Sequence, residues 1–170
     1  AIHMARRGDF YGFEAEPKVD FKRVMARMNE IRNAGSKGLR SWMENTRNVT
    51  FMQGYASFVQ NKVLEVNGEQ LTAKNIYINV GTRPSAPPIS GLEKVNWLDS
   101  AGLLDLESLP RHLLIIGGGY IGVEFAQVFK RLGAQITLIQ RGNQLMPQED
   151  EDVARSIQNA LEAEGIAIKL

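Results

Sequence analysis

Apolar and polar residues follow one another along the chain with a spacing that changes from helix-like to strand-like and back. Between residues 21 and 43 apolar residues recur every three or four positions, which predicts a helix with one apolar face. Asp20 stands at the expected N-cap, and Gly35 and Gly38 are expected to weaken or bend this helix. From residue 49 the spacing falls toward two, which predicts strands. The predicted strands cover residues 49–52, 55–60, 62–66, 70–73 and 76–80.

A tight turn and a stiff connector mark this first half of the chain. Asn67-Gly68 predicts a β-hairpin, because both central residues of the favoured turn need a positive φ. The segment 84–91 is rich in proline and ends in glycine. Such a segment is typical of a domain boundary. We therefore expect one domain over residues 1–90 and another over residues 91–170.

The second half alternates apolar strands with amphipathic helices. An apolar run at 113–116 precedes a helical pattern that ends at Gly133, and a β-branched run follows at 135–140. The acidic run 149–152 is expected to be the solvated start of a further helix, and a last strand starts at 166. This order is half of a doubly wound sheet. We expect an α/β chain with a Rossmann-like fold, incomplete at both ends, and a small antiparallel sheet in its first half.

Glycines between the strand at 113–116 and the next helix follow the spacing G-x-G-x-x-G, which is typical of a site for a dinucleotide diphosphate. Gly117 allows the tight turn, Gly119 leaves room for a phosphate, and Gly122 lets the helix pack closely on the strand. The helix start offers unpaired N–H groups to the anion. A strand-turn-helix without a ligand is the alternative. The residues expected to line the site are Gly117, Gly118, Gly119, Tyr120, Ile121 and Gly122.

The end of the second strand of this half bears on the choice of coenzyme. An acidic residue about 20 positions past the glycines favours NAD, because it binds the ribose hydroxyls. Gln140 stands at this position and Arg141 follows it. A neutral amide does not repel a 2′-phosphate, and an arginine can bind one with paired hydrogen bonds. The sequence therefore favours NADP over NAD, with a solvated turn residue as the alternative for Arg141.

Composition excludes several other classes of site. The 170 residues contain no cysteine, which removes thiolate catalysis, disulfides and cysteine metal ligands within this chain. His3 and His112 are far apart and have no metal-ligand spacing, so we expect ordinary histidines and no metal site. The net charge is +1 and no apolar run is long enough to span a bilayer. We expect a cytoplasmic protein that binds neither nucleic acid nor a membrane.

Several stretches resemble the pyridine nucleotide-disulfide oxidoreductases, the flavoproteins that include dihydrolipoamide dehydrogenase, glutathione reductase and mercuric reductase. The resemblance is carried by residues 117–125, preceded by residues 78–84 and 89–92. Residues 5–7 and 138–141 make the chain most similar to the mercuric reductase branch. The resemblance covers nearly the whole chain.

This resemblance implies two cofactors, FAD in one domain and NAD(P)H in a second. A hydride would pass from the nicotinamide to the flavin, and the electrons would go on to a disulfide or metal-ion substrate. Tyr55 and Ala56 match a place where main-chain atoms touch the FAD adenine. Gly81 and Thr82 match a segment that runs past the FAD, although Thr82 could also be an ordinary residue of a turn at a strand end.

The same resemblance implies catalytic roles for two residues of the glycine-motif helix. Tyr120 matches an aromatic residue that shields the flavin and moves aside for the nicotinamide. Glu124 matches a carboxylate close to the nicotinamide. Two other interpretations stay open. Tyr120 could be a packing residue, and a carboxylate such as Glu124 is favoured in a first helical turn with or without a ligand.

Parts of the family pattern are absent from these residues. The first glycine motif, the redox cysteine pair and the C-terminal interface domain are all missing. We therefore expect an internal piece of a longer, homodimeric enzyme, inactive when isolated. Two other functions stay open: a related flavoprotein without redox cysteines, of the NADH-oxidase or ferredoxin-reductase type, and a non-catalytic nucleotide-binding module.

Overall fold

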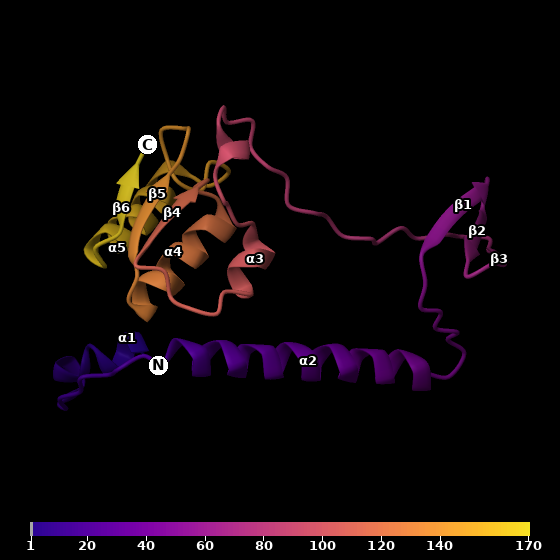
Figure 1. The fold of residues 1–170 in the computed structure, drawn as a ribbon, viewed down its shortest axis with the longest axis horizontal. Helices are drawn as coiled ribbons and strands as arrows, with labels where there is room; N and C mark the ends of the chain where they lie inside the picture. Colours follow the sequence, from indigo (N-terminus) through magenta and orange to yellow (C-terminus); the bar gives the residue numbers. More distant parts are fainter. Residues whose placement is uncertain (1) are drawn as a thin grey trace. The chain divides into compact units, whose positions relative to one another are not determined.

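The computed structural model describes residues 2–170 and is an α/β fold with two separate sheets (Figure 1). The chain divides into two compact units. One unit contains the residues up to Arg27 together with Leu92–Leu170, and the other contains Met28–Gly91. The division at residues 91 and 92 falls at the end of the proline-rich connector, while the first 27 residues contact the half that carries the glycine motif.

The unit Met28–Gly91 holds the small antiparallel sheet. Its strands are β1 (Ala56–Gln60), β2 (Val63–Val66) and β3 (Glu69–Thr72). The turn between β2 and β3 is the predicted hairpin, with φ of +53° at Asn67 and +83° at Gly68. The strand prediction is thus confirmed for the three central runs.

Two predicted strands of this unit are wrong. Residues 49–52 and 76–80 have no regular secondary structure, and Tyr77, Ile78 and Val80 are well exposed. A strand is stable only when a neighbour takes up its main-chain hydrogen bonds. Within residues 2–170 neither segment has such a neighbour.

A single long helix, α2 (Phe21–Asn45), follows the short elements α1 (Ile2–Ala5) and η1 (Gly8–Tyr11). Asp20 caps its start, because the Asp20 carboxylate accepts a hydrogen bond from the Arg23 N–H at 3.0 Å. Gly35 and Gly38, which were expected to weaken or bend the helix, do not interrupt it. Among the described residues no helix is both long and apolar enough to cross a membrane.

The other unit contains a parallel sheet in the order β4-β5-β6. Strand β4 (His112–Ile116) leads through the glycine motif into α4 (Tyr120–Leu132), and β5 (Gln135–Ile139) lies beside β4. Helix α5 (Glu151–Ala163) then leads into β6 (Ala167–Lys169), which pairs with β5. The short elements η2 (Leu92–Lys94) and α3 (Ser100–Leu104) precede β4. The predicted strand-helix-strand-helix-strand order is therefore confirmed.

The core of this unit lies between the helices and the middle strand. Ala126 and Phe129 of α4, Ile136 and Leu138 of β5 and Leu161 of α5 are at most 2% exposed. Phe21 adds its ring 6.1 Å from the Phe129 ring.

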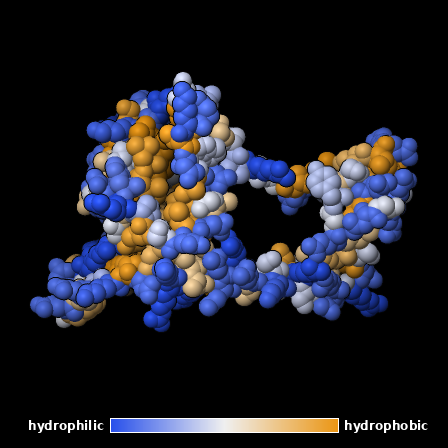
Figure 2. All heavy atoms as spheres, in the orientation of Figure 1, coloured by the Kyte–Doolittle hydropathy of each residue, from blue (hydrophilic) through white to orange (hydrophobic). Residues whose placement is uncertain are grey.

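Many other apolar side chains stay at the surface of both units (Figure 2). On α2 most of the exposed apolar residues lie in its middle and later part, and on β4 they lie on one face of the strand. The clearest cases are Ile31, Leu39 and Trp42 on α2, and Leu114 and Ile116 on β4. Covering a side chain of this kind stabilises a protein by about 1.5–3 kcal/mol. Exposed apolar faces of this kind are typical of contact surfaces.

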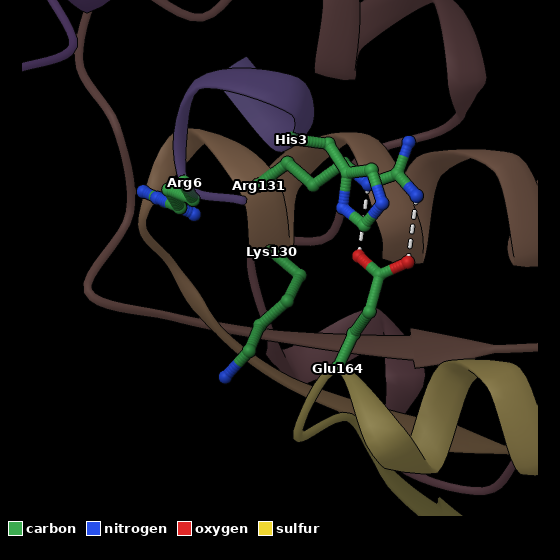
Figure 3. A pocket seen from close by; sticks show the side chains of 5 residues that line it. All are labelled: His3, Arg6, Lys130, Arg131 and Glu164. Carbon is green, nitrogen blue, oxygen red and sulfur yellow. Dashed lines mark hydrogen bonds and ion pairs between the residues drawn. The ribbon is translucent and has the colours of Figure 1, made fainter. Parts of the chain in front are cut away.

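An ion pair joins the end of α4 to the end of α5. The Arg131 guanidinium donates to both oxygens of the Glu164 carboxylate, at 2.6 and 2.8 Å (Figure 3). The Gln127 side-chain NH₂ group also donates to this carboxylate, at 2.8 Å. The pair lies in a hollow that is also lined by His3, Arg6 and Lys130. The hydrogen bonds from Arg131 lower the pKa of Glu164, against the opposing effect of partial burial.

We expect Glu164→Gln to lower the free energy of unfolding by about 1–2 kcal/mol at neutral pH, because it removes a charge-assisted, partly buried contact. A lowered pKa in the folded state means that this stability is present above the ordinary glutamate pKa of about 4.3 and is lost as the pH falls through the folded value. The difference between the two proteins should therefore shrink in acid. Urea unfolding of the intact protein at neutral and acidic pH measures it.

The matched control is Glu151→Gln, which breaks the more exposed ion pair with Arg155. Solvent screens an exposed pair, so little change is expected. Equal losses for both variants would contradict the stabilising role of Arg131 and Glu164.

Candidate functional site

The turn between β4 and α4 requires glycine at two positions. Gly117 has φ +109°, in the region that favours glycine, and its N–H donates to the Ile139 carbonyl at 2.8 Å. A Cβ added to Gly122 would lie 1.9 Å from the Gly117 carbonyl oxygen. These are the close turn and the close helix-strand approach that the sequence pattern predicts.

Gly119 differs, because its Cβ position faces open space. No atom lies within 4 Å of the place where a Cβ would be, and its φ of −79° is accessible to any residue. Among residues 2–170 no protein acceptor meets the amides of Gly119, Tyr120 or Ile121. An open surface beside unpaired amides at the positive end of a helix can hold an anion.

Gly118 and Gln140 face each other across this turn. The Gly118 N–H donates to the side-chain oxygen of Gln140 at 3.0 Å, so the first two amides of the motif are engaged by protein atoms. Because an N–H needs an acceptor, the Gln140 oxygen must point at the turn, and its NH₂ group points elsewhere. Arg141, the next residue, is exposed. The structure thus brings the Gln140 side chain to the glycine motif.

The loop 141–150 is fastened to the glycine turn, which the sequence did not predict. The Met146 N–H donates to the Gly118 carbonyl at 2.7 Å, and Leu145 is fully buried. A Cβ on Gly118 would lie only 2.5 Å from the Leu145 side chain. The one signal in the sequence was the apolar pair Leu145-Met146 inside an otherwise polar segment.

Tyr120 and Glu124 are placed on the open side of α4. Both are exposed, and their spacing of four puts them on one helix face. Ile121 is also exposed. The Tyr120 hydroxyl donates a hydrogen bond to Glu149, and this bond to a carboxylate raises the pKa of Tyr120 above its ordinary value. Glu149 therefore does more than supply charge at the start of α5.

The residues matched to the FAD side belong to the other unit. Tyr55 and Ala56 lie at the start of β1, and Gly81 and Thr82 lie in the irregular segment after β3. All four are exposed, and Gly81 has φ +69°.

The two histidines lie at different places in the same unit. His112 pairs with the Thr137 hydroxyl at 2.9 Å, and His3 lines the hollow at Glu164. No group of three or more metal-binding side chains occurs among the described residues.

Comparison with known proteins gives a consistent family. The pattern of the pyridine nucleotide-disulphide oxidoreductases matches residues 3–170. The chain is 37% identical to a mercuric reductase of Lysinibacillus sphaericus, over 97% of this chain and 30% of that protein. It is 36% identical to the probable pyridine nucleotide-disulfide oxidoreductase RclA of Escherichia coli (strain K12), over 92% of this chain and 37% of that protein. It is 32% identical to a dihydrolipoyl dehydrogenase of Bacillus subtilis (strain 168), over 98% of this chain and 38% of that protein.

Solved structures agree with these sequence relatives. The structure of the HOCl-induced flavoprotein disulfide reductase RclA from Escherichia coli matches with a TM-score of 0.80 at 34% identity, over 98% of this chain and 37% of that chain. The chain thus spans about a third of the length of the relatives that it matches. With the family pattern extending over nearly all of its residues, the chain belongs to the pyridine nucleotide-disulphide oxidoreductase family.

Proposed function

We propose that this chain is part of an FAD-dependent oxidoreductase that takes a hydride from NAD(P)H. Residues 91–170 would form the first half of the NAD(P)H-binding domain, and residues 1–90 part of the FAD-binding domain. The observation that carries the proposal is the open N-terminus of α4, where the Gly119, Tyr120 and Ile121 amides have no protein acceptor. The exposed apolar faces of α2 and β4 support completion of both units by further polypeptide.

The residues present fit the coenzyme diphosphate. The amides of Gly119, Tyr120 and Ile121 would bind it, and the α4 dipole would stabilise its charge. Gly117 and Gly122 would keep the turn tight enough for this approach. When bound, the nicotinamide supplies a hydride and the flavin accepts it. Glu124, one helical turn from the diphosphate site, would orient the nicotinamide amide.

The remaining site residues would serve the flavin. The Tyr120 ring would shield it until the nicotinamide arrives. The main chain of Tyr55 and Ala56 would contact the FAD adenine, and Gly81 and Thr82 would run past the cofactor. The relatives' names include a mercuric reductase and a dihydrolipoyl dehydrogenase. We therefore propose a disulfide or a metal ion as the electron acceptor. A homodimer as the working form is a further proposal, which rests on the family resemblance alone.

We propose NADPH rather than NADH as the coenzyme, and the contacts of Gln140 support this choice. The Gly118 N–H donates to the Gln140 side-chain oxygen, so the Gln140 NH₂ group is a donor that this contact does not use. A 2′-phosphate is an acceptor and would be repelled by a carboxylate at this place. Arg141 is exposed beside it and can add paired hydrogen bonds.

The experiment uses the intact protein that contains these residues. If the proposal is right, the purified protein is yellow, and anaerobic NADPH bleaches the flavin absorption band faster than an equal concentration of NADH. A colourless protein, or a flavin band that neither coenzyme changes, would contradict the proposed function.

A further inference from the structure

The side chain of Tyr120 is held by one contact rather than by burial. Its hydroxyl donates to the carboxylate of Glu149, while the residue stays 51% exposed. Tyr120 is the first residue of α4, and Glu149 lies near the end of the loop 141–150. Removing this hydrogen bond would therefore free the ring to move.

A free ring at this position can reach the anion site. Side chains of a helix lean toward its N-terminus, so Tyr120 projects toward the end of α4 where the free amides are. The Gly119, Tyr120 and Ile121 amides at that end would bind the coenzyme diphosphate. A ring that is not held to one side would compete with the diphosphate for this space.

Glu149 is itself firmly placed. Its N–H donates to the Met146 carbonyl at 2.9 Å, and its carbonyl accepts from the Gln144 side chain at 3.0 Å. Met146 is in turn bound to the Gly118 carbonyl. The carboxylate that holds Tyr120 is thus anchored to the glycine turn.

We propose that Glu149 is a positioning residue: it holds the Tyr120 ring against the loop 141–150 and so keeps the first-turn amides of α4 open to the coenzyme diphosphate. The inference rests on the proposed function. It assigns to Glu149 a role in coenzyme entry and none in the transfer of the hydride.

When Glu149 is replaced, this role and simple electrostatics predict changes of opposite sign in the strength of coenzyme binding. A carboxylate near a diphosphate repels it, so loss of the charge alone would strengthen coenzyme binding. Loss of the hydrogen bond would weaken binding, because only the fraction of molecules with the ring held aside could accept the coenzyme. The direction of the change separates the two effects.

The test is rapid mixing of the intact, flavin-containing protein with NADPH under anaerobic conditions. The half-saturating NADPH concentration and the limiting rate of flavin bleaching are measured separately. For Glu149→Ala we expect the half-saturating concentration to rise about 3- to 10-fold, with the limiting rate within about two-fold of the unmodified protein. Glu149→Gln keeps an acceptor for the Tyr120 hydroxyl and should restore the original value or improve on it.

Two further variants complete the test. Asp150→Asn removes the neighbouring charge but keeps a good N-cap for α5, so no rise is expected. Tyr120→Phe removes the same hydrogen bond from the other side and tests the inference even if Glu149→Ala does not fold. In a Tyr120→Phe background, Glu149→Ala should produce no additional rise, because the hydroxyl is already missing.

If NADPH bleaches the unmodified protein, but the half-saturating NADPH concentration is unchanged or lower in both Glu149→Ala and Tyr120→Phe, this inference is overturned. The proposed function is then left intact. Absence of bleaching in the unmodified protein would overturn the proposed function and this inference together.

Discussion

Gly122→Ala is expected to lower the free energy of unfolding by about 3 kcal/mol or more and to weaken coenzyme binding roughly 100-fold. In most helix interiors the same change is stabilising by up to about 1 kcal/mol, because alanine is the better helix former. Here the new methyl group would lie 1.9 Å from the Gly117 carbonyl oxygen. The oxygen belongs to the main chain and cannot rotate away, so β4 and α4 must move apart. Urea unfolding and NADPH titration of the intact protein measure the two effects.

Gly119→Ala is the matched control for this prediction. Its Cβ would meet no atom within 4 Å, and its φ suits alanine, so the free energy of unfolding should fall by less than about 1 kcal/mol. The same methyl would stand where the diphosphate approaches, so coenzyme binding should still weaken. A Gly122→Ala protein as stable as Gly119→Ala would contradict the close approach of β4 and α4.

Arg141→Glu is expected to raise the KM for NADPH about 10- to 100-fold and the KM for NADH by much less. The arginine is exposed at the end of β5, next to Gln140, which is hydrogen-bonded to the glycine turn. A carboxylate there would repel a 2′-phosphate but could accept hydrogen bonds from the ribose hydroxyls of NADH. Steady-state kinetics of the intact protein with each coenzyme measure the two values.

Arg111→Glu makes the same charge change just before β4, at the other end of the strand from the glycine turn. It should affect both coenzymes alike and only slightly, because solvent and salt screen distant charges. Equal effects of Arg141→Glu on NADPH and NADH would remove the assignment of Arg141 to the 2′-phosphate.

Local chemistry explains which parts of the fold could be predicted. The Asn67-Gly68 hairpin, the Asp20 cap and the turn at Gly117 each depend on residues close in sequence, and the structure contains all three. The segments 49–52 and 76–80 have strand-like composition, but a strand also needs a partner, which composition cannot supply. The helix α2 continues without interruption at Gly35 and Gly38, because the free-energy cost of two glycines is small for a helix of 25 residues.

The candidate site shows the same limit. Spacing alone placed the glycines between a strand and a helix and Gln140 at the end of the next strand. It could not show that the Gln140 side-chain oxygen accepts a hydrogen bond from the Gly118 N–H. Nor could it show that Glu149, the first residue of the acidic run 149–152, accepts a hydrogen bond from the Tyr120 hydroxyl. Both contacts depend on how the loop 141–150 folds back on the turn, through the buried side chain of Leu145. No periodic pattern of residues in the sequence reveals such long-range contacts.

The most direct test of the account is a crystal structure of the intact protein with NADP⁺ bound. We predict diphosphate oxygens within hydrogen-bonding distance of the Gly119, Tyr120 and Ile121 amides, and the adenosine 2′-phosphate beside Gln140 and Arg141. A coenzyme bound elsewhere, with protein atoms filling the N-terminus of α4, would contradict the central claim.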